Sequence, residues 1–257
     1  IFGLPYVFYK AGFFTGLVVM IVASFVMLII SLYLGEVILR TKGKHQLSGL
    51  AERYFGNKGK TIMFIAEILS IYGALAAYIV GSGQALAAIF GGNTLIYSVL
   101  FFIVVAAVIF FSINIIENFE AIFSPIKILL ALILSFLLLR FIDFGNISGF
   151  SFGNLLVPYG ISIFAFAGLS ALPEMNEELK NKKYMFSAIV AGMVITFIVY
   201  LIFVFSAIGA LAEVDEVATV SLSKFGFGVN LFANLFTLFA LATAFVGLGF
   251  ALKENFT

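Results

Sequence analysis

Two apolar stretches of the chain contain glycine and proline together, and both could break a membrane-spanning helix. The first is IFGLPY, with Gly3 and Pro5, and the second is FAFAGLSALPE, with Gly168, Ser170 and Pro173. A broken helix exposes backbone N–H and C=O groups that can bind a carboxylate, an ammonium group or an ion. Transport proteins commonly bind substrate at such breaks, although glycine and proline are also simply frequent in membrane helices. We therefore expect an open site between Gly3 and Gly168.

Aromatic side chains near these breaks are further candidates for substrate binding. Phe164, Ala165 and Phe166 precede the glycine of the second break, and the segment YGALAAYIVGSG places Tyr72 and Tyr78 in another apolar run. A tyrosine hydroxyl facing the protein interior could bond a substrate carboxylate, and ordinary packing explains either tyrosine equally well. Few charges lie near the expected site, so the sequence favours a neutral substrate with a large apolar or aromatic side chain.

Lys127 is the only basic residue that lies deep within an apolar run. A charge at that depth is costly unless it faces a cavity or a partner. Desolvation also lowers the proton affinity of a lysine, which makes reversible protonation possible near neutral pH. The hydroxyl of Thr243 and the opened carbonyls of the first helix are candidate partners. The alternative is a structural lysine that stays charged and permanently bonded.

The composition requires lipid to be part of the solvent. Of the 257 residues, 63% are hydrophobic and 11% charged, and the mean hydropathy is +1.19; a soluble domain carries roughly a quarter charged residues. A net charge of +1 gives no support for a nucleic-acid partner. The chain has no cysteine and one histidine, His45, and it shows neither a nucleophile–base pair nor a metal cluster. We therefore predict neither an enzyme nor a cofactor.

The lengths of the apolar runs predict an all-α membrane protein with about eight transmembrane helices in a single domain, residues 1–257. Residues 1–9 are expected to be the second half of a span whose first half is missing, and the abrupt ends suggest a fragment of a longer protein without a signal peptide. Continuous runs of this kind do not fit the alternating strands of a membrane barrel. The remaining spans are predicted at 13–39, 61–90, 95–112, 115–142, 154–173, 184–212 and 228–252.

Most basic residues fall in loops that share one side of the membrane if the spans alternate. The positive-inside rule then places loops 40–60 and 174–183 in the cytoplasm of a multi-pass cell-membrane protein. Within the first loop, His45–Gly56 has the spacing of a short amphipathic helix at the interface. The acidic segment Glu213–Ser223 is expected to be a solvated external loop.

Several segments, in order, resemble amino-acid permeases of the amino acid/auxin permease or aromatic amino-acid permease group. The resemblance is to the first helix in IFGLPYVFYKAG, the fifth in ENFEAIFSPIKILLALIL, the sixth in FAFAGLSALPEMNEELKNKK and the eighth in FALATAFVGLGFAL. The group belongs to the amino acid–polyamine–organocation superfamily, so the resemblance implies a LeuT-type fold of ten core helices in two inverted repeats. Helices one to five would occupy 1–143, helices six to eight would occupy 154–257, and the C-terminal helices would be missing.

The resemblance also implies a type of ion coupling. In sodium-coupled relatives the eighth helix supplies cation ligands through the pattern Ala-x-x-Thr-Ser, which here ends in Thr243 and Ala244, without the second hydroxyl. In proton-coupled relatives a fifth-helix lysine stands in place of the cation, and Lys127 matches it in position. The implied function is alternating-access, proton-coupled uptake of neutral or aromatic amino acids. A sodium-coupled transporter or an exchanger on the same fold is the alternative.

Overall fold

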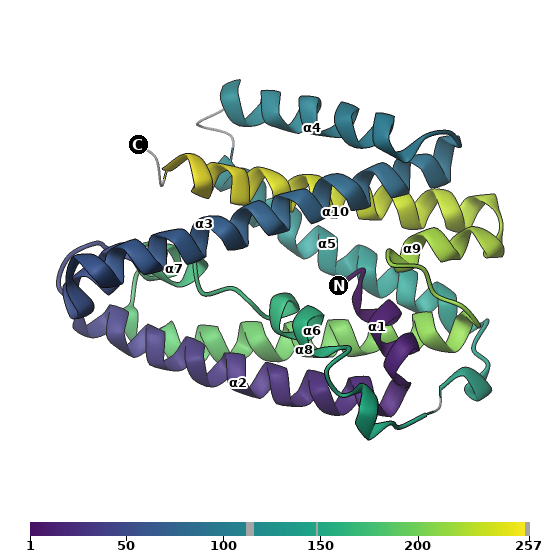
Figure 1. Ribbon diagram of the computed structural model, residues 1–257, viewed down its shortest axis with the longest axis horizontal. Coiled ribbons are helices and arrows are strands. Elements are labelled where there is room, and N and C mark those ends of the chain that lie inside the picture. Colours follow the sequence, from purple (N-terminus) through teal and green to yellow (C-terminus); the bar gives the residue numbers. More distant parts are fainter. Residues whose placement is uncertain (112–115, 148, 255–257) are drawn as a thin grey trace.

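The computed structural model describes residues 1–111, 116–147 and 149–254, and no strand occurs among them (Figure 1). The predicted all-α class is therefore confirmed for this part of the chain. The long helices are α2 (Phe13–Arg40), α3 (Leu47–Phe90), α4 (Thr94–Phe111), α5 (Ile116–Leu139), α8 (Met185–Ala210) and α10 (Phe227–Glu254). The short ones are α1 (Leu4–Ala11), α6 (Tyr159–Ala165), α7 (Ala171–Glu178) and α9 (Ala218–Ser221), with 3₁₀ turns at Phe144–Asn146, Phe152–Asn154, Lys182–Tyr184 and Leu222–Phe225.

Some of the described helices are long and apolar enough to cross a bilayer, and others are shorter. The spanning stretches are Phe13–Arg40, Leu47–Phe90, Lys182–Ala210 and Phe227–Gly249, and the shorter apolar helices cover Thr94–Phe110 and Pro125–Leu139. The span predicted at 154–173 is instead divided between α6 and α7. The structure supports a membrane protein with several spans, and the count of eight stays a prediction.

The helices form two groups, joined by α5 (Figure 1). One group contains α1, α2, α6, α7 and α8, with α2 in purple and α8 in green running along the lower side of the view. The other contains α3, α4 and α10. Because α5 packs against both α8 and α10, it connects the two groups along its length.

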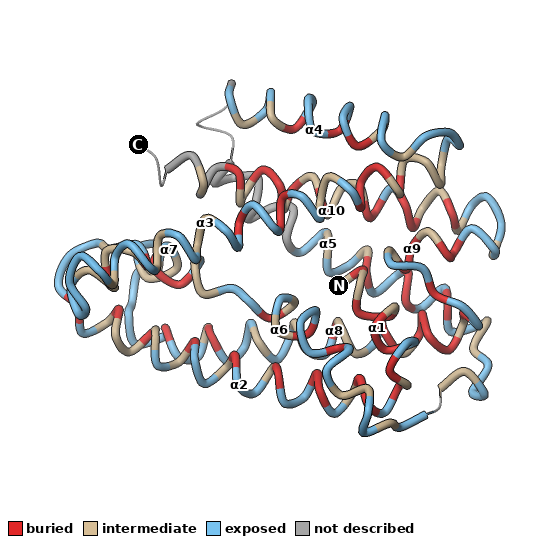
Figure 2. Tube along the Cα trace, in the orientation of Figure 1, coloured by how far each residue is buried: buried red, intermediate tan, exposed pale blue. Residues whose placement is uncertain are grey.

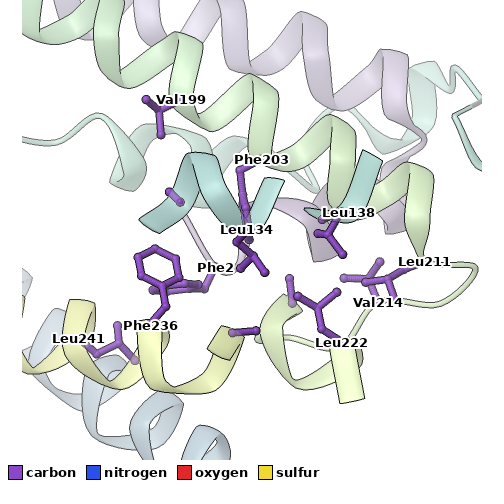
Figure 3. Close-up of a cluster of buried hydrophobic side chains, with 14 residues drawn as sticks. Phe2, Leu134, Leu138, Val199, Phe203, Leu211, Val214, Leu222, Phe236 and Leu241 are labelled. Carbon is purple, nitrogen blue, oxygen red and sulfur yellow. The ribbon is translucent and has the colours of Figure 1, made fainter. Parts of the chain in front are cut away.

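The Phe2 cluster is the buried core at the junction of these groups (Figure 3). The ring of Phe2 meets Phe203 of α8 at 6.4 Å and Phe236 of α10 at 5.3 Å, edge to face in both pairs. The N–H of Ala218 in α9 donates to the carbonyl oxygen of Phe2 at 3.1 Å. The segment before α1 is thus fixed between the groups. The buried members of the cluster are Phe2, Ala131, Leu134, Leu138, Val199, Phe203, Ala207, Leu211, Val214, Ala218, Leu222, Ala233, Phe236 and Leu241.

The outer helix faces are apolar, as expected for surfaces that meet lipid. On α2, Phe25 is 61% exposed and Tyr33 is 72% exposed, and on α4, Leu95 and Phe110 exceed 70%. Figure 2 shows that α4 is exposed along most of its length. A water-soluble protein rarely exposes contiguous apolar faces of this size, so the fold agrees with the composition.

The amphipathic helix predicted at His45–Gly56 is present as the first part of α3. It is separated from the spanning part by Gly56, whose φ of +68° is a left-handed conformation that favours glycine. Leu47 and Leu50 are buried. The apolar spacing of the sequence therefore identified both parts of α3, and Gly56 marks the boundary.

The prediction of a solvated loop at Glu213–Ser223 is wrong in part. Asp215 is exposed, but most of residues 217–222 are buried or partly buried, and they include α9. The hydroxyl of Thr219 lies 2.6 Å from the hydroxyl of Thr237 on α10, and Ser221 donates to the Asp215 carboxylate at 2.7 Å. The hydropathy of the sequence does not predict α9, because hydrogen bonds of polar side chains hold this helix in place.

Gly83 provides a test of the packing between α3 and α4. A Cβ atom at this position would lie 2.0 Å from Oγ of Ser98 and 2.7 Å from the carbonyl oxygen of Thr94. Because the backbone oxygen cannot move aside cheaply, we expect Gly83→Ala to reduce the free energy of unfolding by about 1–3 kcal/mol. Gly73→Ala is the matched control, since nothing lies within 4 Å of its Cβ position, and it should be neutral or slightly stabilising. Thermal stability of the full-length protein in detergent measures both, and equal losses would contradict the close approach.

Candidate functional site

The break predicted in the sixth span is present. α6 ends at Ala165 and α7 begins at Ala171, so no continuous helix runs through residues 164–173. Pro173 lies in the first turn of α7. N–H groups in the first turn have no acceptor within the helix, so the missing N–H of proline costs no hydrogen bond there. Gly168 lies in the middle of the break, and nothing stands within 4 Å of its Cβ position. The local sequence therefore accounts for where the helix stops and restarts.

Backbone hydrogen bonding across the break is incomplete. A turn-type bond closes the end of α6, in which the N–H of Ala167 donates to the carbonyl of Phe164 at 3.1 Å. The next N–H groups, those of Gly168, Leu169 and Ser170, donate to no acceptor within the described residues. They lie at the N-terminus of α7, where the helix dipole favours negative charge. Such an arrangement can bind a carboxylate.

Gly3 lies beside the same region. It is the N-terminal cap of α1, and Pro5 stands in the first turn. A Cβ atom on Gly3 would lie 3.5 Å from Cδ1 of Ile161, which is on α6 one turn before Phe164. The start of α1 therefore lies against α6, but Gly3 does not line the cavity described below, and an open site between Gly3 and Gly168 stays a prediction.

A cavity of about 290 Å³ lies beside the break, between α2, α6, α7 and α8. Most of its walls are apolar, with hydroxyl groups at three positions. Of the predicted site residues, Ala165, Phe166 and Gly168 line it. The lining residues are Ser31, Ala165, Phe166, Ala167, Gly168, Leu172, Met175, Ala188, Ile189, Gly192, Met193, Thr196 and Tyr200.

Aromatic rings form one wall of this cavity. Phe166 is 4% exposed, and its ring lies 5.5 Å from Tyr200 and 6.4 Å from Phe197, nearly parallel to the latter. The hydroxyl of Tyr200 donates to the carbonyl oxygen of Ala165 at 3.2 Å. This bond joins α8 to the last residue of α6, and so it fixes the edge of the break.

The other predicted aromatic residues lie outside the cavity. Phe164 is 45% exposed and Tyr72 is 53% exposed, and neither lines it. Tyr78 packs against the Phe2 cluster, as Tyr200 of the cavity also does, but it does not line the cavity. Tyr72 lies on an exposed face of α3.

Lys127 lies on α5, which joins the two helix groups, and Thr243 lies on α10, which packs against α5. Lys127 is partly buried on α5, and Thr243 is 4% exposed on α10. The hydroxyl of Thr243 donates to the carbonyl oxygen of Ala240 in its own helix at 3.0 Å. Within the described part of the chain, no group of three His, Cys, Asp or Glu side chains could hold a metal. The role of Lys127 and Thr243 in ion coupling stays a prediction.

Sequence reasoning missed three hydroxyl-bearing residues of the cavity, Ser31, Thr196 and Tyr200. Thr196 and Tyr200 are four residues apart within an apolar helix, so they share one face of α8. Polar residues at such positions commonly mark a functional site in membrane helices. This signal was available in the sequence, but it does not reveal which face of α8 meets α6.

The loops predicted to be cytoplasmic meet at one end of the molecule. The ammonium group of Lys44, after α2, forms an ion pair with the carboxylate of Glu177 in α7. In Figure 1 this is the left end, where the first part of α3 turns past α7. The two segments therefore share a side, and which side of the membrane it faces stays a prediction.

Comparison with known proteins identifies the family of the chain. Residues 1–257 match the tryptophan/tyrosine permease family. Tyrosine-specific transport system 1 of Haemophilus influenzae is 31% identical over 229 residues, which cover 80% of this chain and 56% of that protein. The chain thus spans little more than half the length of this curated relative. No solved structure gives a significant match. The chain belongs to the tryptophan/tyrosine permease family.

Proposed function

We propose that this chain is the substrate-binding part of a secondary active transporter for aromatic amino acids. The observation that carries the proposal is the interrupted α6–α7 segment, whose free N–H groups and adjoining cavity lie within a member of the tryptophan/tyrosine permease family. The 31% identity to a tyrosine-specific transport system supports an aromatic substrate. The same family match and similarity favour a transporter over an enzyme.

The substrate backbone would be held at the break. Its carboxylate would accept hydrogen bonds from the N–H groups of Gly168, Leu169 and Ser170 at the positive end of α7. Its ammonium group would face carbonyl oxygens left open on the α6 side and near Gly3. Neutral peptide dipoles suit a zwitterion, because they bind both charges without adding a net charge to the bilayer interior.

Alternating access would come from relative motion of the two helix groups. The site lies in the group that contains α1, α6 and α8, while α3, α4 and α10 form the other. α5 contacts both groups and the Phe2 cluster lies at their junction. Movement there would open the site to one side of the membrane and then to the other, as the LeuT-type repeat arrangement implies.

Proton coupling through Lys127 is the favoured mechanism. Lys127 lies on α5, where a change of charge can act on both groups, and the eighth-helix pattern lacks the second hydroxyl expected of a sodium site at Ala244. Protonation would favour one access state over the other. Sodium coupling, or amino-acid exchange on the same fold, is the alternative. The protein would act in the cell membrane with loops 40–60 and 174–183 in the cytoplasm.

Filling the break tests the substrate site. Nothing lies within 4 Å of a Cβ at Gly168, so a larger side chain there meets open space and would occupy the ligand position. We expect Gly168→Leu to reduce uptake of labelled tyrosine into proteoliposomes by about tenfold or more, with thermal stability unchanged. Gly160→Leu is the control, since this α6 glycine is equally uncrowded but does not line the cavity. Normal uptake by Gly168→Leu would contradict the site.

Removing the charge of Lys127 tests the coupling. Lys127→Ala and Lys127→Met should both abolish accumulation driven by a proton gradient, while exchange of labelled for unlabelled substrate continues. Lys224→Met serves as the control, because Lys224 is an exposed residue outside the spans. If Lys127→Ala accumulates substrate with the wild-type pH dependence, or if the wild type requires sodium, Lys127 has a structural role.

A further inference from the structure

The cavity beside the break has the lining expected of an aromatic side-chain site. Phe166 and Tyr200 supply ring faces on one wall. On α8, Ala188 and Gly192 stand one turn apart and line the cavity, and at Gly192, which is exposed, nothing lies within 4 Å of the Cβ position. Its volume of about 290 Å³ is at the small end of the range for ligand pockets. A single amino acid, rather than a larger ligand, fits that size.

The polar groups of the cavity are hydroxyls without charge. Ser31 of α2 is 4% exposed, and Thr196 of α8 is partly buried; within the described chain neither side chain has a hydrogen-bond partner. The Tyr200 hydroxyl uses its proton on the Ala165 carbonyl and retains its capacity to accept. Because they line the cavity, both hydroxyls are available to a ligand hydroxyl.

The break and the cavity are continuous. One wall of the cavity is formed by the end of α6 and the start of the interruption, which are Ala165 and then Phe166, Ala167 and Gly168. An amino acid whose carboxylate meets the N-terminus of α7 can therefore direct its side chain between α2 and α8 without crossing another helix.

We infer that this cavity is the side-chain subsite of the transporter, and that Thr196 and Ser31 recognise the phenol hydroxyl of tyrosine. The inference rests on the proposed function, because it assumes that the substrate backbone is held at the break. Phe166 and Tyr200 contact the ring, Gly192 provides its space, and the hydroxyl of Thr196 distinguishes tyrosine from phenylalanine. A lipid acyl chain is the competing occupant of an apolar cavity in a membrane protein.

Removing one hydroxyl tests the recognition of phenol. Thr196→Val keeps the shape of the side chain and deletes the hydrogen-bonding group. Competition binding to the purified full-length protein should show tyrosine affinity lowered by about two- to tenfold and phenylalanine affinity unchanged. The control is Ser187→Ala, on the same helix at an exposed position outside the cavity, which should alter neither affinity.

Filling the space tests the location of the ring. Gly192→Leu should weaken binding of both tyrosine and tryptophan by about tenfold or more, while the melting temperature stays at or above that of the wild type. Val194→Leu, at a position 48% exposed and outside the cavity, is the matched control. If Gly192→Leu lowers the melting temperature, its weaker binding could reflect loss of folding, and the Thr196→Val experiment then decides whether the cavity is the subsite.

The outcomes separate the subsite from the transport function. A wild-type protein that binds no aromatic amino acid overturns the proposed function. The subsite is overturned, and the proposed function stands, if the wild type binds tyrosine but Thr196→Val changes the affinities for tyrosine and phenylalanine equally or changes neither. Unchanged tyrosine binding by Gly192→Leu also overturns the subsite, and loss of a co-purifying lipid from that variant would assign the cavity to an acyl chain.

Discussion

Satisfaction of backbone hydrogen bonds within lipid is the constraint on which this structure depends. A chain that spans a bilayer must pair its N–H and C=O groups within helices, because hydrocarbon offers no partner. The α6–α7 segment departs from that rule at Gly168, Leu169 and Ser170. Unpaired groups are tolerated where they line a cavity, and the space of about 290 Å³ beside them supplies one. The cavity therefore explains how the break is tolerated within the bilayer.

The Phe2 cluster sets the position of the break relative to the rest of the molecule. Phe2 contacts α8 and α10 from opposite helix groups, and its carbonyl accepts from α9. The next residue, Gly3, then meets Ile161 of α6. A shift between the groups would act directly on the glycine-containing segments, because a few bonds of chain join the core to the site. The packing thus gives the proposed motion a physical route to the substrate.

Local signals in the sequence were sufficient for the long helices and for the break. Apolar runs located these helices, Gly56 divides α3, and Gly168 with Pro173 marked the interruption, since each effect depends on neighbouring residues alone. Tyr72 and Thr196 could not be placed in this way. The face of a membrane-spanning helix that becomes buried depends on the helices that pack against it. The sequence alone does not reveal that face, because a chain with 33 phenylalanines has apolar residues on every face of its helices. α9 was missed for a related reason, because distant hydroxyl groups hold it.

The lack of charge in the cavity limits how such a site can discriminate between substrates. Shape separates aromatic side chains from small ones but distinguishes poorly between phenylalanine and tyrosine, which differ by a single oxygen. A pocket can reject the ligand that lacks a hydroxyl when its own buried polar groups would be left unpaired. Ser31 and Thr196 are the groups assigned to this role in the inferred subsite, since they are polar residues among mostly apolar walls. In the proposed site the peptide dipoles of the break would bind the carboxylate and ammonium groups that all amino acids share, and the two hydroxyls would bind the phenol group that distinguishes tyrosine from phenylalanine.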